Sequence, residues 1–269
     1  MGDRASEPRR HSGDPGPRGG SSEHAHGARS GAERGDGVTT LLLKLKAPSQ
    51  AWGSSSRYQR RETHLVPTKS GVVGLLAASE GRRRTDPVED LAGLEFGVRV
   101  DQPGTLLRDY QTAIDWEKRS SARLSERYYL QDACFVAAIS GPVELIESLE
   151  GALATPSYPL YLGRRACPAG PDLVLGVSDL EVEEALRSVA WQASGWYRKT
   201  RGTQVPLPIY RDARPGEPVE ERVQDLPLSF DPARREYGWR SVHMPEPHIV
   251  ANTEGRDRVD PFWEAVVGA

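Results

Sequence analysis

Cationic and aromatic side chains that suit phosphates and stacked bases alternate in the segment from residue 50 to residue 78. Arg57, Arg60 and Arg61 surround Tyr58 in this segment. Guanidinium groups bind phosphate oxygens, and an aromatic ring stacks on the face of a base. This composition is typical of a nucleic-acid contact and not of a hydrophobic core.

A helix is predicted directly after this basic run. Thr68 can cap the free N–H groups at its N-terminus, and Lys69, Ser70 and Gly71 keep its entrance basic, hydroxylated and open to close approach. Apolar residues between 72 and 77 then bury the helix. The sequence therefore predicts a polyanion site at the N-terminus of a packed helix.

The basic residues are concentrated in one part of the chain. The whole sequence of 269 residues carries a formal net charge of -3, which argues against nucleic-acid binding through overall positive charge. Residues 57–84 nevertheless contain seven Lys or Arg and two acids. With 37% apolar residues, the chain can also bury a core. We therefore expect a local basic surface on a folded scaffold.

Cysteine usage and hydropathy indicate the compartment. Cys134 and Cys167 lie far apart, with no CxxC pair and no neighbouring histidine ligands, which predicts a reduced, cytoplasmic protein without structural zinc or any other cofactor. No apolar run approaches the roughly 18 residues of a membrane span. The N-terminus also lacks the apolar stretch of a signal peptide, so we expect no membrane contact.

The periodicity of apolar residues predicts an alternation of strands and helices. Strands are expected at 39–45, 94–100, 128–139, 159–163 and 173–177, and helices at 68–79, 141–153 and 181–191. Strand, helix, strand, repeated twice, is the order of a ferredoxin-like α+β fold, with both helices on one face of an antiparallel sheet.

The chain divides into parts of different composition. Residues 1–37 are rich in Gly, Ser and charged side chains and are predicted to form a disordered tail. Residues 38–170 hold the ferredoxin-like pattern, interrupted at 105–127 by a polar insertion that we interpret as a protruding hairpin or thumb. Residues 171–269 are less regular and are expected to form a small subdomain or an elaborated edge of the sheet.

Several motifs, in order and spacing, resemble one known family. They are AWGSSSRYQRRET, PTKSGVVGLLAA, FGVRVDQPG, LLRDYQTA, RYYLQDACF and PLYLGRRACP. Together they resemble the CasD subunits of type I-E CRISPR Cascade complexes, in CRISPR-associated protein family 5 of the RAMP superfamily. The resemblance runs from about Thr39 to Pro168.

This resemblance implies a noncatalytic RNA-binding subunit with a ferredoxin-like RAMP domain. It implies that the subunit holds the repeat-derived 5′ tag of the CRISPR RNA and caps the backbone filament, with a thumb near the junction of tag and guide. The implied partners are the CasC backbone subunit, the large CasA subunit and, through the complex, target DNA.

By motif position, RNA binding is carried over to ten residues: Gln50, Trp52, Gly53, Arg57, Lys69, Ser70, Arg108, Tyr110, Arg164 and Arg165. Arg164 and Arg165 are the strongest candidates, because paired arginines after a Gly turn are hard to explain by packing.

Several of these residues also have a structural interpretation. Trp52 could anchor the core, and Arg108 could pair with Asp109. Gly71 and Gly74 could serve close helix packing. Arg57, Arg60 and Arg61 could be ordinary surface residues, and the run at 82–84 could be a solvated charged turn.

Two other functions compete with a noncatalytic RNA holder. A metal-independent endoribonuclease would need a base, an acid and a cation, and His64, Tyr58 and Lys69 could fill these roles. A protein scaffold with secondary RNA contacts is the other alternative, which the interleaved Arg and aromatic residues disfavour.

Overall fold

Apolar side chains on both faces place β7 (Cys134–Pro142) in the interior of the main sheet. β7 pairs antiparallel with β1 (Val38–Lys46) on one side and with β4 (Glu95–Gln102) on the other. β8 (Val174–Ser178) follows at the far side of β1. These strands confirm the predictions at 39–45, 94–100 and 173–177, and they form an antiparallel order β4-β7-β1-β8.

The computed structural model describes residues 2, 38–53, 60–114, 117 and 123–256. The predicted tail at 1–37 lies outside these residues, apart from Gly2, and so do Arg57 and Tyr58. Among the described helices, none is both long and apolar enough to cross a membrane.

Helices cover the sheet on both faces. Leu41, Leu43 and Leu45 of β1 pack on the side of α1 (Lys69–Ser79) and α3 (Val143–Ala154). The intervening Leu42 points to the other side, where it meets α4 (Val182–Ser188). A helix covers this second face because the alternating residues of β1 and β7 are apolar on both sides. The predicted helices are thus confirmed, and the prediction of helices on one face holds for α1 and α3 alone.

Strands from residue 171 onwards extend the same sheet beyond β4. β10 (Ile209–Asp212) pairs with β4, and β12 (Glu236–His243) lies between β10 and β11 (Glu221–Ser229). The remaining elements of this part are α5 (Gly195–Arg198) and a small sheet of β9 (Gln204–Leu207) and β13 (His248–Ala251).

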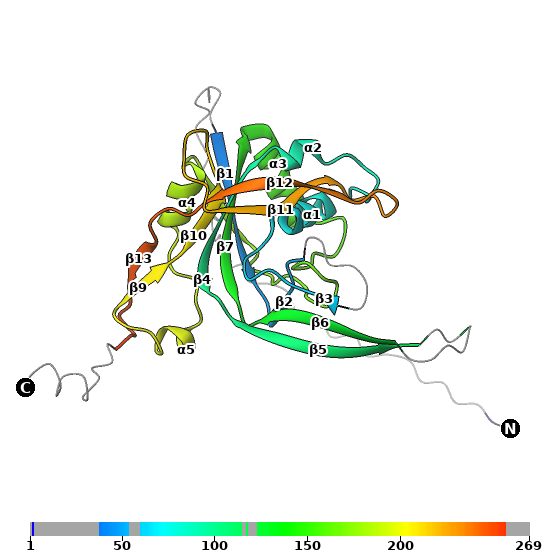
Figure 1. Ribbon diagram of the computed structural model, residues 1–269, viewed down its shortest axis with the longest axis horizontal. Coiled ribbons are helices and arrows are strands. Elements are labelled where there is room, and N and C mark those ends of the chain that lie inside the picture. Colours follow the sequence, from blue (N-terminus) through cyan, green and yellow to red (C-terminus); the bar gives the residue numbers. More distant parts are fainter. Residues whose placement is uncertain (1, 3–37, 54–59, 115–116, 118–122, 257–269) are drawn as a thin grey trace, which may run out of the picture. The chain divides into compact units, whose positions relative to one another are not determined.

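The segment predicted as a thumb forms a long antiparallel hairpin of β5 (Thr105–Ala113) and β6 (Arg123–Gln131). Figure 1 shows it running away from the main sheet. Two short strands, β2 (Ser49–Gln50) and β3 (Arg60–Arg61), pair with β6 near its base. A short helix, α2 (Glu89–Ala92), precedes β4.

Two predicted strands are wrong. The single strand expected at 128–139 is divided into β6 and β7, because Asp132 adopts a positive φ of 56° and the chain turns there out of the sheet. The strand expected at 159–163 is a tight loop, in which Gly163 has a φ of 88° and the N–H of Leu162 donates to the carbonyl of Cys167 (2.7 Å).

Candidate nucleic-acid interface

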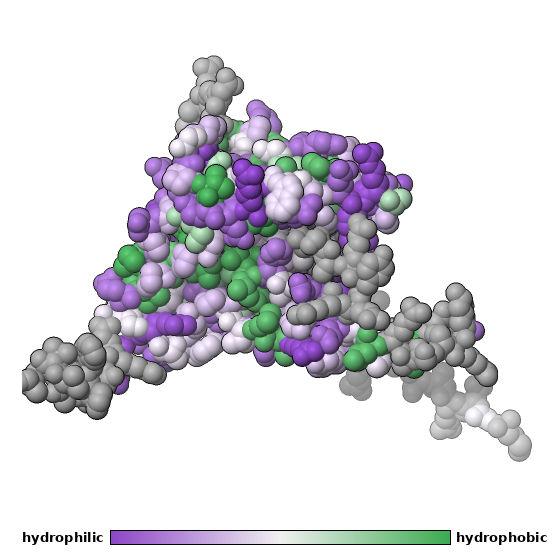
Figure 2. Space-filling model, in the orientation of Figure 1, coloured by the Kyte–Doolittle hydropathy of each residue, from purple (hydrophilic) through white to green (hydrophobic). Residues whose placement is uncertain are grey.

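A basic groove of about 1120 Å³ lies between α1, the loop at 158–165 and the turn that joins β11 to β12. We call it the arginine groove. Figure 2 shows hydrophilic side chains gathered at the outer end of β11 and β12. Among the described residues that line it, Glu62 is the only acid, against eight arginines, which are Arg61, Arg82, Arg83, Arg84, Arg164, Arg165, Arg234 and Arg235.

Most of these arginines are exposed to solvent. Among them, Arg83, Arg84, Arg165 and Arg235 make no side-chain hydrogen bond or ion pair within the described part of the chain. Arg82 differs, because its guanidinium is held by Glu80 (2.7 Å) and Asp90 (2.5 Å). Unpaired guanidinium groups on three separate segments give the groove its capacity to bind phosphates.

Aromatic rings lie among these cations. Tyr158 is 46% exposed, and Tyr161, Tyr237 and Phe230 are half-buried along the groove. An exposed tyrosine face among arginines offers a stacking surface for a base. The groove thus has both kinds of contact that a bent single strand needs.

Arg164 and Arg165 are placed differently, although they are neighbours. The Arg164 guanidinium donates to the carbonyls of Tyr128 (3.0 Å), Arg61 (2.9 Å) and Glu62 (3.2 Å), and it lies 4.7 Å from the centre of the Tyr129 ring. It therefore ties the base of the thumb to β3. Both arginines line the groove, and Arg165 is exposed there.

The predicted phosphate site at the entrance of α1 is filled by the protein itself. The backbone N–H of Lys69 donates to the buried carboxylate of Asp225 (2.8 Å), and the Lys69 Nζ pairs with Asp212 (3.0 Å). A helix N-terminus attracts negative charge, and here a carboxylate from β11 supplies it. Lys69 and Ser70 are both buried, although Ser70 still lines the groove, so the RNA contact for which they are candidates stays a prediction.

Gln50 and Trp52 are likewise enclosed. Gln50 donates to the carbonyls of Leu45 and Ala133 (both 2.9 Å) and accepts from the Trp52 indole N–H (3.0 Å). Trp52 lies under the groove against Gly71, where an added Cβ would come within 2.7 Å of the indole ring. Trp52 is thus packed into the core and Gly71 serves close packing, while Trp52, Gly53 and Gly71 all line the groove. Direct RNA contact by Gln50 and Trp52 stays a prediction.

Arg108 and Tyr110 lie on the thumb and not in the groove. Arg108 pairs across the hairpin with Glu126 (2.7 Å), and its guanidinium lies 4.6 Å from the centre of the exposed Tyr110 ring. The alternative pair with Asp109 is wrong, because the Asp109 carboxylate accepts from Gln111 (2.8 Å).

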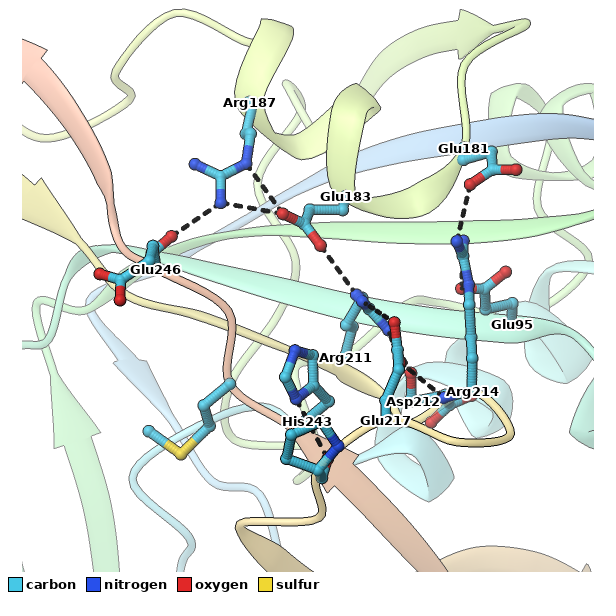
Figure 3. A network of polar contacts seen from close by, with 12 residues as sticks. Glu95, Glu181, Glu183, Arg187, Arg211, Asp212, Arg214, Glu217, His243 and Glu246 are labelled. Atoms are coloured by element: carbon cyan, nitrogen blue, oxygen red, sulfur yellow. Dashed lines mark hydrogen bonds and ion pairs between the residues drawn. The ribbon is translucent and has the colours of Figure 1, made fainter.

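An ion-pair network fastens the added strands to the sheet (Figure 3). Arg211 on β10 pairs with Glu183 of α4 (3.0 Å) and with Glu217 (2.7 Å), and Arg214 pairs with Glu95 of β4 (3.0 Å). The hydrogen bond from Arg211 lowers the pKa of Glu217 to about 2. This network holds β10 and the loop before β11 in place, and so positions the turn that carries Arg235.

Comparisons with known proteins give the family. Residues 40–243 match the model of a family described as CRISPR-associated protein (Cas_Cas5). The chain belongs to the Cas5 family. It is 36% identical to the CRISPR system Cascade subunit CasD of Escherichia coli (strain K12) over 156 residues, which cover 51% of this chain and 70% of that protein.

Two solved structures resemble this Cas5 chain over most of its length. A chain of a structure titled CRISPR RNA-guided surveillance complex has a TM-score of 0.65 and 28% identity, covering 85% of this chain and 98% of its own. One titled Crystal structure of Cas protein has a TM-score of 0.59 and 33% identity, covering 81% and 98%.

One wall of the groove in this Cas5 chain is not predicted by the sequence motifs. Arg234 and Arg235 fall in a stretch rich in proline and charge, beyond the motifs that carry the resemblance. A signal is nevertheless present in the sequence. Arg234 and Arg235 lie close to Tyr237, the same combination of paired arginines and a tyrosine as Tyr58, Arg60 and Arg61. For the run at 82–84 the sequence leaves a solvated charged turn and a phosphate contact both open, and the structure places the run at the groove.

Proposed function

We propose that this Cas5 chain is a noncatalytic CRISPR RNA-binding subunit of the type I-E Cascade surveillance complex, and that it holds the repeat-derived 5′ tag in the arginine groove. One observation carries the proposal: exposed, unpaired arginines from three distant segments converge on a single groove. The identity with CasD and the likeness to a chain of a surveillance complex support it.

The chemistry of the groove fits a bent single strand of RNA. Such RNA is bound through its phosphates and through bases that are splayed onto planar groups. Arg83, Arg84, Arg165 and Arg235 would contact the phosphates, and the exposed ring of Tyr158 would stack on a base. Gly53, without a side chain, allows the backbone to approach.

The remaining parts of the proposal concern the thumb and the partners. The element order β1-α1-β4-β7-α3-β8 with sheet order β4-β7-β1-β8 supports a ferredoxin-like RAMP domain. Arg108 and Tyr110 on the thumb would lie at the junction of tag and guide. The subunit would cap the filament by contacting CasC and CasA, and it would meet target DNA through the complex.

The endoribonuclease alternative gains no support from the geometry. Lys69, its proposed cation, is buried and paired with Asp212. His64 is exposed but does not line the groove among the described residues, and Tyr58 lies outside them. A base, an acid and a cation are therefore not brought together in the described part of the chain.

The salt dependence of tag binding tests the proposal. Arg83→Ala and Arg235→Ala should each weaken binding of the 5′-tag RNA and reduce the slope of log K against log salt by about 0.7, and together by about 1.4, since each phosphate contact on a single strand contributes about that amount. Binding is measured by fluorescence anisotropy in EDTA from low to moderate salt.

The matched control is Arg222→Ala, an exposed arginine on β11 that does not line the groove. It should leave the slope as in the native protein. Equal slopes for the groove variants and the native protein would contradict the groove assignment. Discrete cleavage of repeat RNA in EDTA, lost in His64→Ala, would instead establish the nuclease.

A further inference from the structure

A second basic and aromatic surface surrounds α5. We call it the α5 platform and define it by Trp196, Tyr197, Lys199, Arg201 and Arg256. The Trp196 side chain is 57% exposed, and its ring meets Tyr197 edge to face with centroids 5.8 Å apart. The Arg201 guanidinium lies 4.3 Å from the centre of the Tyr197 ring. An exposed indole thus lies beside a tyrosine ring that a guanidinium covers.

The charge of this surface is one-sided. Residues 190–208 contain three basic side chains and no acid. Lys199, Arg201 and Arg256 are exposed and have no carboxylate partner within the described residues. The carboxylate of Glu254, which lies close by, pairs with the guanidinium of Arg198 (3.6 Å). The platform therefore complements a polyanion.

Buried hydrogen bonds fix the platform to the rest of the fold. The Trp191 indole N–H donates to the carbonyl of Asp101 on β4 (2.9 Å), and the buried Asn252 donates to the carbonyls of Arg198 (2.8 Å) and Gly202 (3.0 Å). The N–H of Arg256 donates to the carbonyl of Arg201 (3.1 Å). A surface held in this way loses little freedom when a ligand binds.

The platform is separate from the arginine groove. None of its residues lines the groove, and Figure 1 shows α5 near β9, away from α1 and from the turn between β11 and β12. An RNA tag held in the groove leaves this surface unoccupied. Unpaired cations beside an open indole favour a nucleic-acid strand over a protein, because stacking accepts any base and the phosphates satisfy the charges.

We propose that the α5 platform binds a segment of single-stranded nucleic acid, with a base stacked on Trp196 and phosphates on Lys199, Arg201 and Arg256. The strand is either RNA or DNA, since both present the same bases and phosphates to this surface. The proposal does not rest on tag binding in the groove.

Oligonucleotide binding to the full chain tests the platform. The probes are a 12-mer of oligothymidylate and a 12-mer of oligouridylate, followed by anisotropy and by quenching of tryptophan fluorescence. Trp196→Ala should weaken binding at least about fivefold and remove most of the quenching, since stacking on one ring is worth about that much. Arg201→Ala should weaken binding and flatten its salt dependence. Tighter binding of one probe identifies the strand as DNA or RNA.

Matched controls separate this site from the groove. Trp239→Ala removes another exposed tryptophan, 65% accessible, and Arg222→Ala removes another exposed arginine; both should bind as the native protein does. The double variant Arg83→Ala, Arg235→Ala should bind tag RNA more weakly but bind the oligothymidylate as the native protein does.

Three results would overturn the proposal. Native-like binding and quenching in Trp196→Ala and Arg201→Ala would exclude the platform as the site. Loss of oligothymidylate binding in the groove variants alone would assign it to the groove. Unchanged oligonucleotide binding, combined with failure of the platform variants to assemble with other subunits, would show that the surface meets a protein.

Discussion

Adjacent arginines in this chain have different partners, and this difference decides their effect on stability. Arg164 donates to three backbone carbonyls that belong to β6 and to the segment around β3. Arg165, next to it, has no such bonds within the described residues. The sequence gives no means of separating the two.

Substitution of each arginine should separate stability from binding. Arg164→Ala is expected to lower the free energy of unfolding by about 1 kcal/mol, because the partly buried carbonyl of Tyr128 loses a charged donor. Arg165→Ala should change the free energy of unfolding by no more than about 0.5 kcal/mol, and it should weaken the binding of tag RNA. Urea unfolding and anisotropy on the same samples measure both. Equal destabilisation by the two variants would contradict the assignment.

At the level of single residues, burial was the quantity that sequence analysis could not obtain. Gln50 and Trp52 stand in a segment whose neighbours are polar and basic, yet both are fully enclosed. Their burial depends on Leu45, Ala133 and Gly71, which approach only after the sheet and α1 have packed. Motif position located the right segment but not the side chains that face solvent.

Among the elements, α1 shows both the success and the limit of pattern reasoning. Its N-cap at Thr68, its buried face and its end before Gly81 all follow from local residues and are confirmed. The negative charge at its entrance does not follow from local residues, because Asp212 and Asp225 come from strands far along the chain. The turn at Asp132 was missed for a similar reason: its positive φ allows the thumb to leave the sheet, a demand of the fold and not of the local sequence.

The thumb should be separable from the rest of the fold beyond its base. Near the sheet, Tyr129 and Leu130 of β6 are buried in the core, whereas Tyr110 and Leu124 farther out are exposed. Replacing residues 111–125 by Asn-Gly joins Tyr110 to its cross-strand partner Glu126 by a short hairpin turn.

The shortened protein is expected to keep its thermal midpoint within a few degrees, because the removed side chains whose burial the structure describes are exposed or half-buried. RNA that spans the junction of tag and guide should become more accessible to added nuclease, while the tag itself stays protected. The native protein is the reference for both measurements. Unfolding of the variant would show that the outer thumb belongs to the core.

Across the whole molecule, ion pairs join the added strands to the central sheet, and they make its stability depend on pH. Glu217 has its pKa lowered to about 2 from the usual 4.5 by the hydrogen bond from Arg211. The charged form therefore stabilises the fold fully above pH 4.5, and this contribution is lost as the pH falls from about 4.5 towards 2.

Glu217→Gln should accordingly be less stable than the native protein at pH 7, and the difference should shrink between pH 4.5 and pH 3. The midpoint of urea unfolding at several pH values measures this. Glu221→Gln serves as the control, because this exposed glutamate makes no ion pair within the described residues. A constant difference between native and Glu217→Gln across the range would rule out the linkage.

The groove itself could be predicted only in part, because it is a property of the assembled chain. Sequence analysis identified the loop after Gly163 and the segment before α1, which are local motifs. The third wall comes from the turn at Arg234 and Arg235, which reaches the groove because β10, β12 and β11 extend the sheet past β4. No local pattern specifies that extension.

The two partners at the entrance of α1, Lys69 and Asp225, are synthesised at different times. Lys69 leaves the ribosome 156 residues before Asp225, since translation proceeds from the N-terminus. Until Asp225 is translated, the N–H of Lys69 has no carboxylate to donate to, and the full set of contacts at the start of α1 can form only when β11 has been made.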